Sequence, residues 1–384
     1  MRATKISLTL LATSLSLVGL TNVQSVSASA ATATTYTATT YTATTYTATM
    51  AKPHVPAGRN GGTDDYHCFL IDPKVNVDSQ IIASQFVPQN PAIVHHAILF
   101  QVDAADVPQA QKLNVNGDGW TCFGGSGVGG KLGSFLTSPW LSSWAPGRGK
   151  DVMPQGFATT FRKGSQIVLQ VHYNLLAVGT TKKITDQSKV ILNAVPAKSS
   201  KLKIMSSDLV AAPVELACPV GVTGPLCSRS ASLADLAART SSESAFESVG
   251  LNLLCGGNST NPVASVVSTC DKKITADETV IQAAPHMHLL GVSLKLIANP
   301  GTSREQIILN RPHYNFDDQS ATVLKKQIQL KVGDTVRVVC TFNPKLRQMI
   351  PELKKLPARY VTWGEGSSDE MCLGVMGVYL TKKA

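Results

Sequence analysis

Five of the eight histidines of this 384-residue chain stand in three short motifs, each on or beside an expected strand. The motifs are Val94–Phe100 with His95 and His96, Leu169–Tyr173 with His172, and Pro285–His288 with His286 and His288. Neutral imidazole is the commonest metal ligand among protein side chains, so metal chemistry is the first function to consider. Taken alone, each motif is also compatible with ordinary surface or core histidines.

The Pro285–His288 motif has the spacing most typical of a metal site. Residues i and i+2 of a strand point to one face, about 7 Å apart along the chain, so His286 and His288 can reach a single ion. Pro285 cannot donate to a central ladder, which places it at the start or the edge of a strand. The same His-x-His pattern occurs in zinc hydrolases built on (β/α)8 barrels, but this chain lacks the alternating helices of such a barrel.

The other two motifs require particular backbone geometry. Adjacent strand residues point to opposite faces, so His95 and His96 can share an ion only where the strand bends, twists or ends. In the second motif, His172 shares a mainly polar face with Gln170, while the opposite face is apolar. A polar face that includes histidine suits a cleft, and Gln170 is a candidate for positioning an ion at His172.

A methionine completes the candidate ligands. Met371 lies in the polar, loop-like run Ser367–Cys372, although most methionines are simply core residues. Imidazole serves both oxidation states of copper and a thioether favours Cu(I), whereas zinc rarely takes methionine. An all-imidazole site beside a mixed imidazole–thioether site indicates two coppers with different tasks. Because ligating imidazoles must be neutral, copper binding should weaken in acid.

Short strands must position these motifs. Alternating apolar residues predict strands at Ile93–Phe100, Gln166–Tyr173, Ser293–Ala298, Ile328–Val332 and Thr335–Phe342. One helix is expected at Leu233–Arg239, capped by Ser232, inside a Cys-rich stretch 214–272 that has the character of an insertion.

The length suits two domains, and a polar, basic run places their boundary near residue 195, giving domains 61–195 and 196–384.

The N-terminus carries signals for export. Arg2 and Lys5 precede the apolar stretch Ile6–Leu20, which is too short to span a membrane comfortably, and Ala28–Ala30 fits a cleavage site after residue 30. Residues 31–60 have the composition of a low-complexity linker, because the unit Thr-Tyr-Thr-Ala-Thr repeats three times. We therefore expect a signal peptide over 1–30 and a secreted protein without stable membrane insertion.

The eight cysteines fit an oxidising compartment, where an even number permits full pairing. Sequence proximity and the expected strands favour the pairs Cys218–Cys227, Cys255–Cys270 and Cys340–Cys372, which leaves Cys68–Cys122. Other connectivities remain open at this point.

The formal net charge of +10 is spread along the chain without a basic stripe interleaved with aromatic residues. A solvated basic surface is therefore favoured over nucleic-acid binding. The remaining histidines, His54, His67 and His313, are interpreted as ordinary surface residues. The oligomeric state is left open.

Together the motifs resemble the copper type II, ascorbate-dependent monooxygenases, which include the dopamine β-monooxygenases and the peptidylglycine α-hydroxylating monooxygenases. Four motifs match in order over about residues 65–380. They are His95-His96 with Leu99-Phe100, then Gln170-Val171-His172-Tyr173, then His286-Met287-His288 with Leu290-Gly291, and finally Ser368-Asp369-Glu370-Met371-Cys372.

The resemblance implies an all-β fold of two jelly-roll-like antiparallel β-sandwich domains that face each other across a cleft. It implies an electron-donating copper held by His95, His96 and His172, and an O2-activating copper held by His286, His288 and Met371. Ascorbate or a similar one-electron donor would supply electrons for hydroxylation of a C–H bond, and no protein acid or base is required beyond these ligands.

The departures from the family concern the substrate. Peptide-hydroxylating members carry an arginine where this chain has Ala284, and asparagine and tyrosine where it has Leu373 and Val375. The cysteine usual after the first motif is absent, and the 214–272 stretch has no counterpart. A small organic substrate in a less polar pocket is therefore expected instead of a peptidylglycine. Two alternatives remain: a non-catalytic extracellular copper-binding protein, and a zinc hydrolase that uses His286 and His288.

Overall fold

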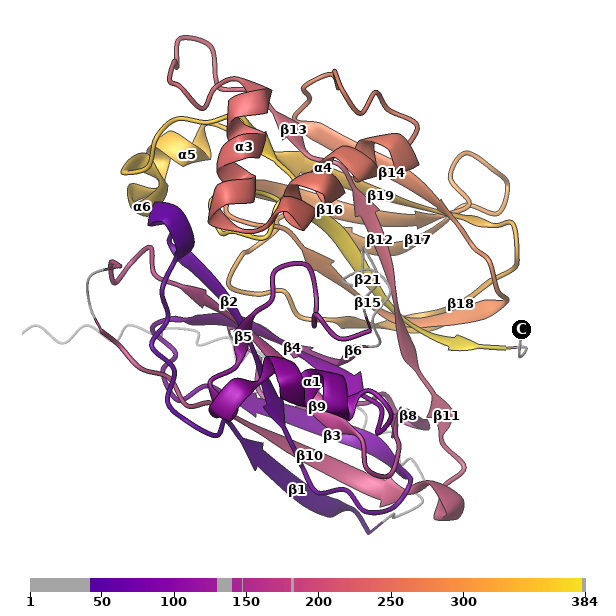
Figure 1. Cartoon of the computed structure of the whole chain (residues 1–384). Helices are drawn as coiled ribbons and strands as arrows, with labels where there is room; N and C mark the ends of the chain where they lie inside the picture. Colours follow the sequence, from indigo (N-terminus) through magenta and orange to yellow (C-terminus); the bar gives the residue numbers. More distant parts are fainter. Residues whose placement is uncertain (1–41, 130–139, 147, 181–182, 382–384) are drawn as a thin grey trace, which may run out of the picture. The chain divides into compact units, whose positions relative to one another are not determined.

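The computed structural model describes residues 42–129, 140–146, 148–180 and 183–381. The expected signal peptide and the first repeats lie outside these residues. The fold is mostly β, with several antiparallel sheets (Figure 1). Among the residues described, no helix combines the length and apolarity needed to cross a membrane.

Two sheets form the N-terminal half. The first has the order β1 (Thr44–Thr49), β10 (Lys189–Pro196), β3 (Ser79–Val87), β8 (Phe157–Phe161) and β11 (Lys203–Ile204), with β7 (Asp151–Val152) also on β3. The second has the order β5 (Trp120–Thr121), β2 (Asp64–Ile71), β9 (Gln166–Asn174), β4 (Val94–Val102) and β6 (Trp140–Trp144). Their facing side chains share one core, as Phe86 and Leu192 of the first sheet and Leu99 and Leu169 of the second illustrate. This packing is sandwich-like.

Two further sheets and a short ribbon form the C-terminal half. One sheet has the order β12 (Ser206–Ala212), β21 (Cys372–Leu380), β15 (Glu278–His286) and β18 (Thr322–Leu330). The other has the order β14 (Val267–Lys273), β19 (Thr335–Phe342), β16 (Gly291–Ala298) and β17 (Gln306–Arg311), while β13 (Glu215–Leu216) pairs with β20 (Val361–Thr362). Val280 and Met376 of one sheet share a core with Leu296 and Val338 of the other.

The helices are short. They are α1 (Val107–Leu113), α3 (Arg229–Arg239), α4 (Ser242–Leu254), α5 (Leu346–Met349) and α6 (Pro351–Lys354), with 3-10 turns at Arg59–Gly61, Val115–Gly117 and Ala197–Ser199. The expected helix in the 214–272 stretch is confirmed as α3, but its cap is Ser228, whose hydroxyl accepts from the Ala231 N–H. Ser232 is instead buried and donates to the Tyr360 carbonyl. The second helix of this stretch, α4, was not expected.

The four expected disulfides are confirmed. The pairs are Cys68–Cys122, Cys218–Cys227, Cys255–Cys270 and Cys340–Cys372. Full pairing indicates an extracytoplasmic protein. Two of these bonds lie close to the candidate ligands, because Cys68 pairs with Gln170, two residues before His172 on β9, and Cys372 directly follows Met371.

Several sequence expectations need correction. The linker assignment over 31–60 is wrong for Thr44–Thr49, which form the edge strand β1 against β10. The strand expected at Ile328–Val332 is the end of a longer strand that stops at Leu330. The pairing of β11 with β8 is parallel, so the sheets are not wholly antiparallel. The domain boundary near 195, the jelly-roll topology and the cleft stay predictions.

Candidate metal centres

The His95–His96 pair lies at an irregular point of the ladder between β4 and β9. Val94 pairs with Tyr173 and His96 pairs with His172, so His95 is an extra residue between two paired ones. Such a β-bulge redirects a side chain to a face that regular alternation would not allow. The bulge is the strand irregularity that a shared ion requires of two adjacent histidines.

The three imidazoles of this half converge through the same ring nitrogen. The Nδ1 atom of His95 lies 3.1 Å from that of His96 and 3.3 Å from that of His172, and the last two lie 3.3 Å apart. Three nitrogens that each bind one ion at about 2.0 Å lie about 3.3–3.5 Å from one another. All three side chains are buried. The spacing therefore fits one metal ion with three nitrogen ligands.

Hydrogen bonds at the opposite ring nitrogens of His172 and His96 set the proton positions of these two rings, whereas the buried Nε2 atom of His95 has no hydrogen-bond partner among the described residues. The Nε2–H of His172 donates to the Asp64 carboxylate at 2.8 Å. The Nε2 atom of His96 lies 3.5 Å from the Tyr66 hydroxyl oxygen, and that hydroxyl donates to the Glu365 carbonyl. A neutral ring that carries its proton on Nε2 presents a lone pair on Nδ1. Lone pairs that face one another at this distance repel unless a cation lies between them.

Asp64 links this set of ligands to the loop before Met371. Its carboxylate also accepts the backbone N–H of Ser367 at 3.0 Å. Burial alone would raise the pKa of Asp64, but the hydrogen bonds and the charge interaction with His172 and the Ser367 N–H lower that pKa below its ordinary value. The carboxylate is therefore ionised at neutral pH and fixes the orientation and tautomer of His172.

Replacing Asp64 by asparagine is expected to weaken metal binding at His95, His96 and His172 by about 10–100-fold, because an amide keeps the shape but removes the charge that supports the ligand. Competition with a copper chelator measures this affinity. Asp103→Asn, which changes a more exposed carboxylate paired with Arg162, is the control. Equal affinities of the Asp64 and Asp103 variants would show that the charge has no influence on the site.

His286 and His288 lie where β15 ends. His286 is its last residue, and His288 stands in the turn toward β16, so of the two expected alternatives the strand does not start at Pro285. Pairing of β15 with β18 stops at Ala283, and Pro285 pairs only with β21. The proline therefore lies where no further ladder donor is needed. The two imidazole rings remain neighbours, with centroids 5.4 Å apart.

These two imidazoles present the opposite nitrogen from the first set. The Nδ1–H of His286 donates to the Gln319 amide oxygen at 2.6 Å, and that of His288 donates to the Asp369 carbonyl at 3.1 Å. Each neutral ring then carries a lone pair on Nε2. The Nε2 atom of His288 is buried and has no hydrogen-bond partner among the described residues. A buried polar atom without a partner is costly, and a metal ion at this position would satisfy it.

Glu370 positions His288 and Met371 together. Its carboxyl group accepts the backbone N–H groups of His288, Leu290 and Met371 at 2.9, 2.6 and 3.2 Å. Burial raises its pKa to about 8, although these hydrogen bonds act in the other direction. The Cys340–Cys372 disulfide fixes the same segment. Met371, 2% exposed, is held in place by these contacts; it belongs to the buried hydrophobic core and also lines a pocket together with His286.

Acidification from pH 6.5 toward pH 4 is expected to destabilise the metal-free protein. Burial lowers the pKa of His286 to about 4 and that of His288 to about 3. Below pH 6.5 the unfolded chain therefore binds protons that the folded chain does not, and the free energy of unfolding falls, by roughly 5 kcal/mol in total between pH 7 and pH 4.5. Urea unfolding at pH 7 and pH 4.5 measures this change. His288→Gln, which lacks one of these groups, should show a smaller change, and equal changes would contradict the prediction.

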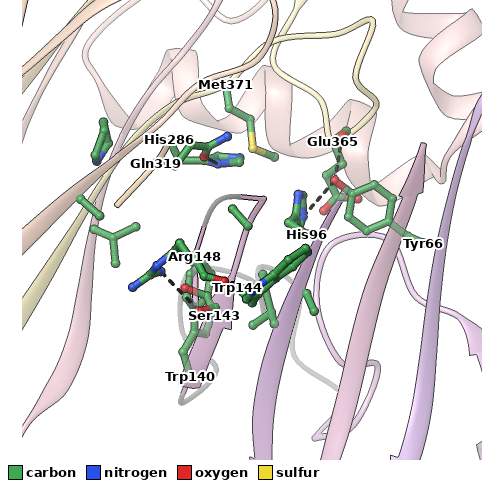
Figure 2. A pocket seen from close by; sticks show the side chains of 16 residues that line it. Tyr66, His96, Trp140, Ser143, Trp144, Arg148, His286, Gln319, Glu365 and Met371 are labelled. Atoms are coloured by element: carbon green, nitrogen blue, oxygen red, sulfur yellow. Dashed lines mark hydrogen bonds between the residues drawn. The ribbon is translucent and has the colours of Figure 1, made fainter. Parts of the chain in front are cut away.

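A pocket with a volume of about 70 Å³ brings the two sets of ligands together. His96 lines it from one side and His286 and Met371 from the other, as Figure 2 shows. The ring centroids of His96 and His286 are 5.7 Å apart. His95 stacks on Phe316, at 4.2 Å between centroids, and Phe316 in turn lies against His288. The six ligand candidates therefore form one neighbourhood.

Several supporting residues were not foreseen. They are Asp64, Tyr66, Phe316, Gln319, Glu365 and Glu370. Their partners are up to about 300 residues away in sequence, so no local pattern marks them; only Glu370, inside the Met371 motif, had a nearby signal. Gln170 donates to the carbonyls of Cys122 and Gly125, and a role in positioning the ion at His172 stays a prediction.

The interpretation of His54 and His67 as ordinary surface residues is wrong. Both are partly buried, and together with Asp65 they form a further cluster of potential metal ligands, apart from the two sets described above. His313 is exposed, as expected.

Comparison with known proteins identifies one part of the chain. Residues 259–383 match the family model described as copper type II ascorbate-dependent monooxygenase, C-terminal domain. His286, His288 and Met371 lie inside this segment, and His95, His96 and His172 lie outside it. No curated protein matches the chain.

The similar solved structures include viral proteins with very low scores. The major capsid protein P2 from bacteriophage PM2 has 7% identity and a TM-score of 0.28, with 89% of this chain and 100% of that chain covered. A structure of infectious bursal disease virus, Gx strain, has 8% identity and a TM-score of 0.18, with 91% and 76% covered. Scores this low support no conclusion about fold or function. The family resemblance of the sequence is confirmed over residues 259–383, which match the model of the C-terminal domain of the copper type II ascorbate-dependent monooxygenases.

Proposed function

We propose that this chain is a secreted two-copper monooxygenase that hydroxylates a C–H bond of a small organic substrate, with O2 as oxidant and ascorbate or a similar one-electron donor as reductant. The observation that carries the proposal is one pocket lined by His96 of the first ligand set and by His286 and Met371 of the second. Copper bound there would supply one-electron transfer at the first set and O2 activation at the second.

The donor atoms favour copper over zinc at the second set. The Nε2 atoms of His286 and His288 are available beside a thioether, and a soft sulfur suits Cu(I). The first set offers nitrogen alone, through Nδ1 of all three rings. Two chemically different sets support a division of tasks, in which His95, His96 and His172 hold the electron donor and His286, His288 and Met371 hold the oxygen-binding ion.

Contact between the two sets supports electron transfer. The His96 and His286 rings are near neighbours, and Phe316 packs between His95 and His288. Two successive polar contacts, from His96 to the Tyr66 hydroxyl and from this hydroxyl to the Glu365 carbonyl, connect the same region. This packing favours passage of electrons through protein side chains over a short distance.

The pocket walls favour a small, largely apolar substrate. Trp140, Trp144 and Ile98 line one side, and Ala284 and Val375 line the other. Ala284 and Val375 occupy two of the positions at which peptide-hydroxylating relatives carry polar groups. Apolar side chains on a pocket wall bind apolar groups and limit the access of water to the reaction.

Oxygen consumption tests the proposed reaction. Copper-loaded protein is incubated with ascorbate, O2 labelled with the heavy isotope 18O, and a panel of small aromatic and aliphatic compounds. The proposal expects O2 uptake that depends on both reductant and substrate, and one labelled oxygen atom in the product. Tight copper binding without substrate-dependent uptake across the panel would instead favour a non-catalytic copper-binding protein. Activity with zinc and without copper would favour a hydrolase.

A further inference from the structure

A third group of potential metal ligands lies on the face of β2 opposite to Asp64. Asp65 and His67 are two residues apart on β2 and share this face, while Asp64 and Tyr66 face His172. The third member, His54, comes from the segment that forms a bridge to Asp186. One potential ligand atom from each of His54, Asp65 and His67 lies within 4.8 Å of the other two.

The hydrogen bonds of His67 leave two acceptors facing each other. Its Nε2 atom lies 3.0 Å from the Asp118 carbonyl, which can only accept, so Nε2 carries the proton. In the neutral ring Nδ1 then carries a lone pair, and this atom lies 3.7 Å from an Asp65 carboxylate oxygen. The other Asp65 oxygen accepts the Ala57 N–H at 3.1 Å and contacts Nε2 of His54 at 2.9 Å.

The backbone is shaped around the His67 ring. Gly119 adopts a left-handed conformation with φ of 79°, and a Cβ atom there would lie 2.7–2.9 Å from atoms of the ring. Only glycine permits both the conformation and the close approach. The Cys68–Cys122 disulfide joins the two segments beside this contact. The imidazole is therefore held in one orientation, with Nδ1 toward Asp65.

The charge at the cluster also favours a cation. Burial alone would raise the pKa of Asp65, but its hydrogen bonds and charge interactions with His54 and His67 lower that pKa to about 2. Asp65 is thus a carboxylate, 7% exposed, between two imidazoles whose side chains are 14–15% exposed. Partial exposure leaves room for water as a further ligand.

We propose that His54, Asp65 and His67 form a third metal site, separate from the two proposed copper sites and suited to a divalent ion such as zinc. Two imidazoles and one carboxylate are a donor set that zinc accepts with a water in the remaining position, and no sulfur ligand favours Cu(I) here. The ion would join the N-terminal segment at His54 to β2 and so stabilise the sandwich edge. The inference does not depend on the proposed monooxygenase function.

Zinc retention tests the third site. The full-length, copper-free protein is mixed with a small excess of Zn2+, freed of unbound metal by gel filtration and assayed for zinc, because Cu2+ loaded first would outcompete zinc at nitrogen and oxygen ligands. The variant His67→Ala is expected to retain one zinc ion per chain less than wild type. The control His313→Ala, which removes an exposed histidine elsewhere, should retain as much zinc as wild type.

A second variant distinguishes loss of a metal ligand from misfolding. His54→Ala removes a ligand from a different segment and should cause the same loss of one zinc ion, while circular dichroism checks that both variants fold. Added Zn2+ should raise the thermal midpoint of wild type and not that of either variant. Equal zinc retention by wild type and the folded variants would overturn the proposal and leave a network of hydrogen bonds only. Because the test is a difference of one ion, it does not depend on whether the copper sites fill.

Discussion

Replacement of Met371 by leucine is expected to lower substrate-dependent O2 uptake by about 100-fold or more while the copper at the first ligand set stays bound. Loss of residues that only support a metal ligand already costs about 10–100-fold, so loss of a ligand should cost at least as much. Leucine keeps the apolar volume of the buried side chain, which limits the effect on folding. Oxygen-electrode assays with ascorbate and copper analysis measure both quantities.

Met376→Leu is the matched control for this change. Met376 is fully buried on β21, the strand that begins directly after Met371, and belongs to the same hydrophobic core. Its replacement should leave O2 uptake within about 3-fold of wild type, because exchange of methionine and leucine in a core is usually tolerated. Similar losses in both variants would mean that Met371 acts through packing and is not a ligand.

Replacement of His172 by alanine is expected to reduce the copper content by one ion per chain and to lower steady-state turnover by about 100-fold or more. His172 supplies one of the three converging Nδ1 atoms and donates to Asp64, so its removal leaves two nitrogens and a buried carboxylate that has lost its histidine donor. The second set of ligands should keep its copper. Copper analysis and turnover with ascorbate test this separation.

The exposed His313 provides the control for His172 as well. His313→Ala should retain both coppers and full turnover. A His172→Ala protein that folds, keeps two coppers and turns over normally would refute the assignment of the first site. A folded variant that loses both coppers would show that the two sets are not independent.

The candidate ligands could be predicted from sequence because their types and spacing are local. His286 and His288 are two residues apart, and Met371 lies beside a cysteine and a polar run, so each motif is visible within a few positions. The bulge at His95 could only be stated as a requirement, since it depends on how β4 pairs with β9. Asp64 and Gln319 could not be found, because they meet the ligands only after folding.

The missed secondary structure has equally physical reasons. Helix α4 contains Gly250, and its Phe246, Leu253 and Leu254 are exposed, so its sequence lacks the apolar stripe that marks a surface helix. The strand β1 was hidden by the repeat that contains it, although Thr and Tyr favour strands and Ala48 alternates into the core. In both segments, packing against neighbours decides a structure that local composition leaves undetermined.

The most direct test of the central claim is the number of copper ions that one chain binds. The measurement uses the His67→Ala background, so that the cluster around Asp65 cannot contribute, and compares copper content after desalting with that of the same protein carrying Met371→Leu or His172→Ala. Two coppers per chain, each weakened or lost with one ligand set, is the expected result. One copper or none in the folded protein, or zinc retained in place of copper, would contradict a two-copper enzyme.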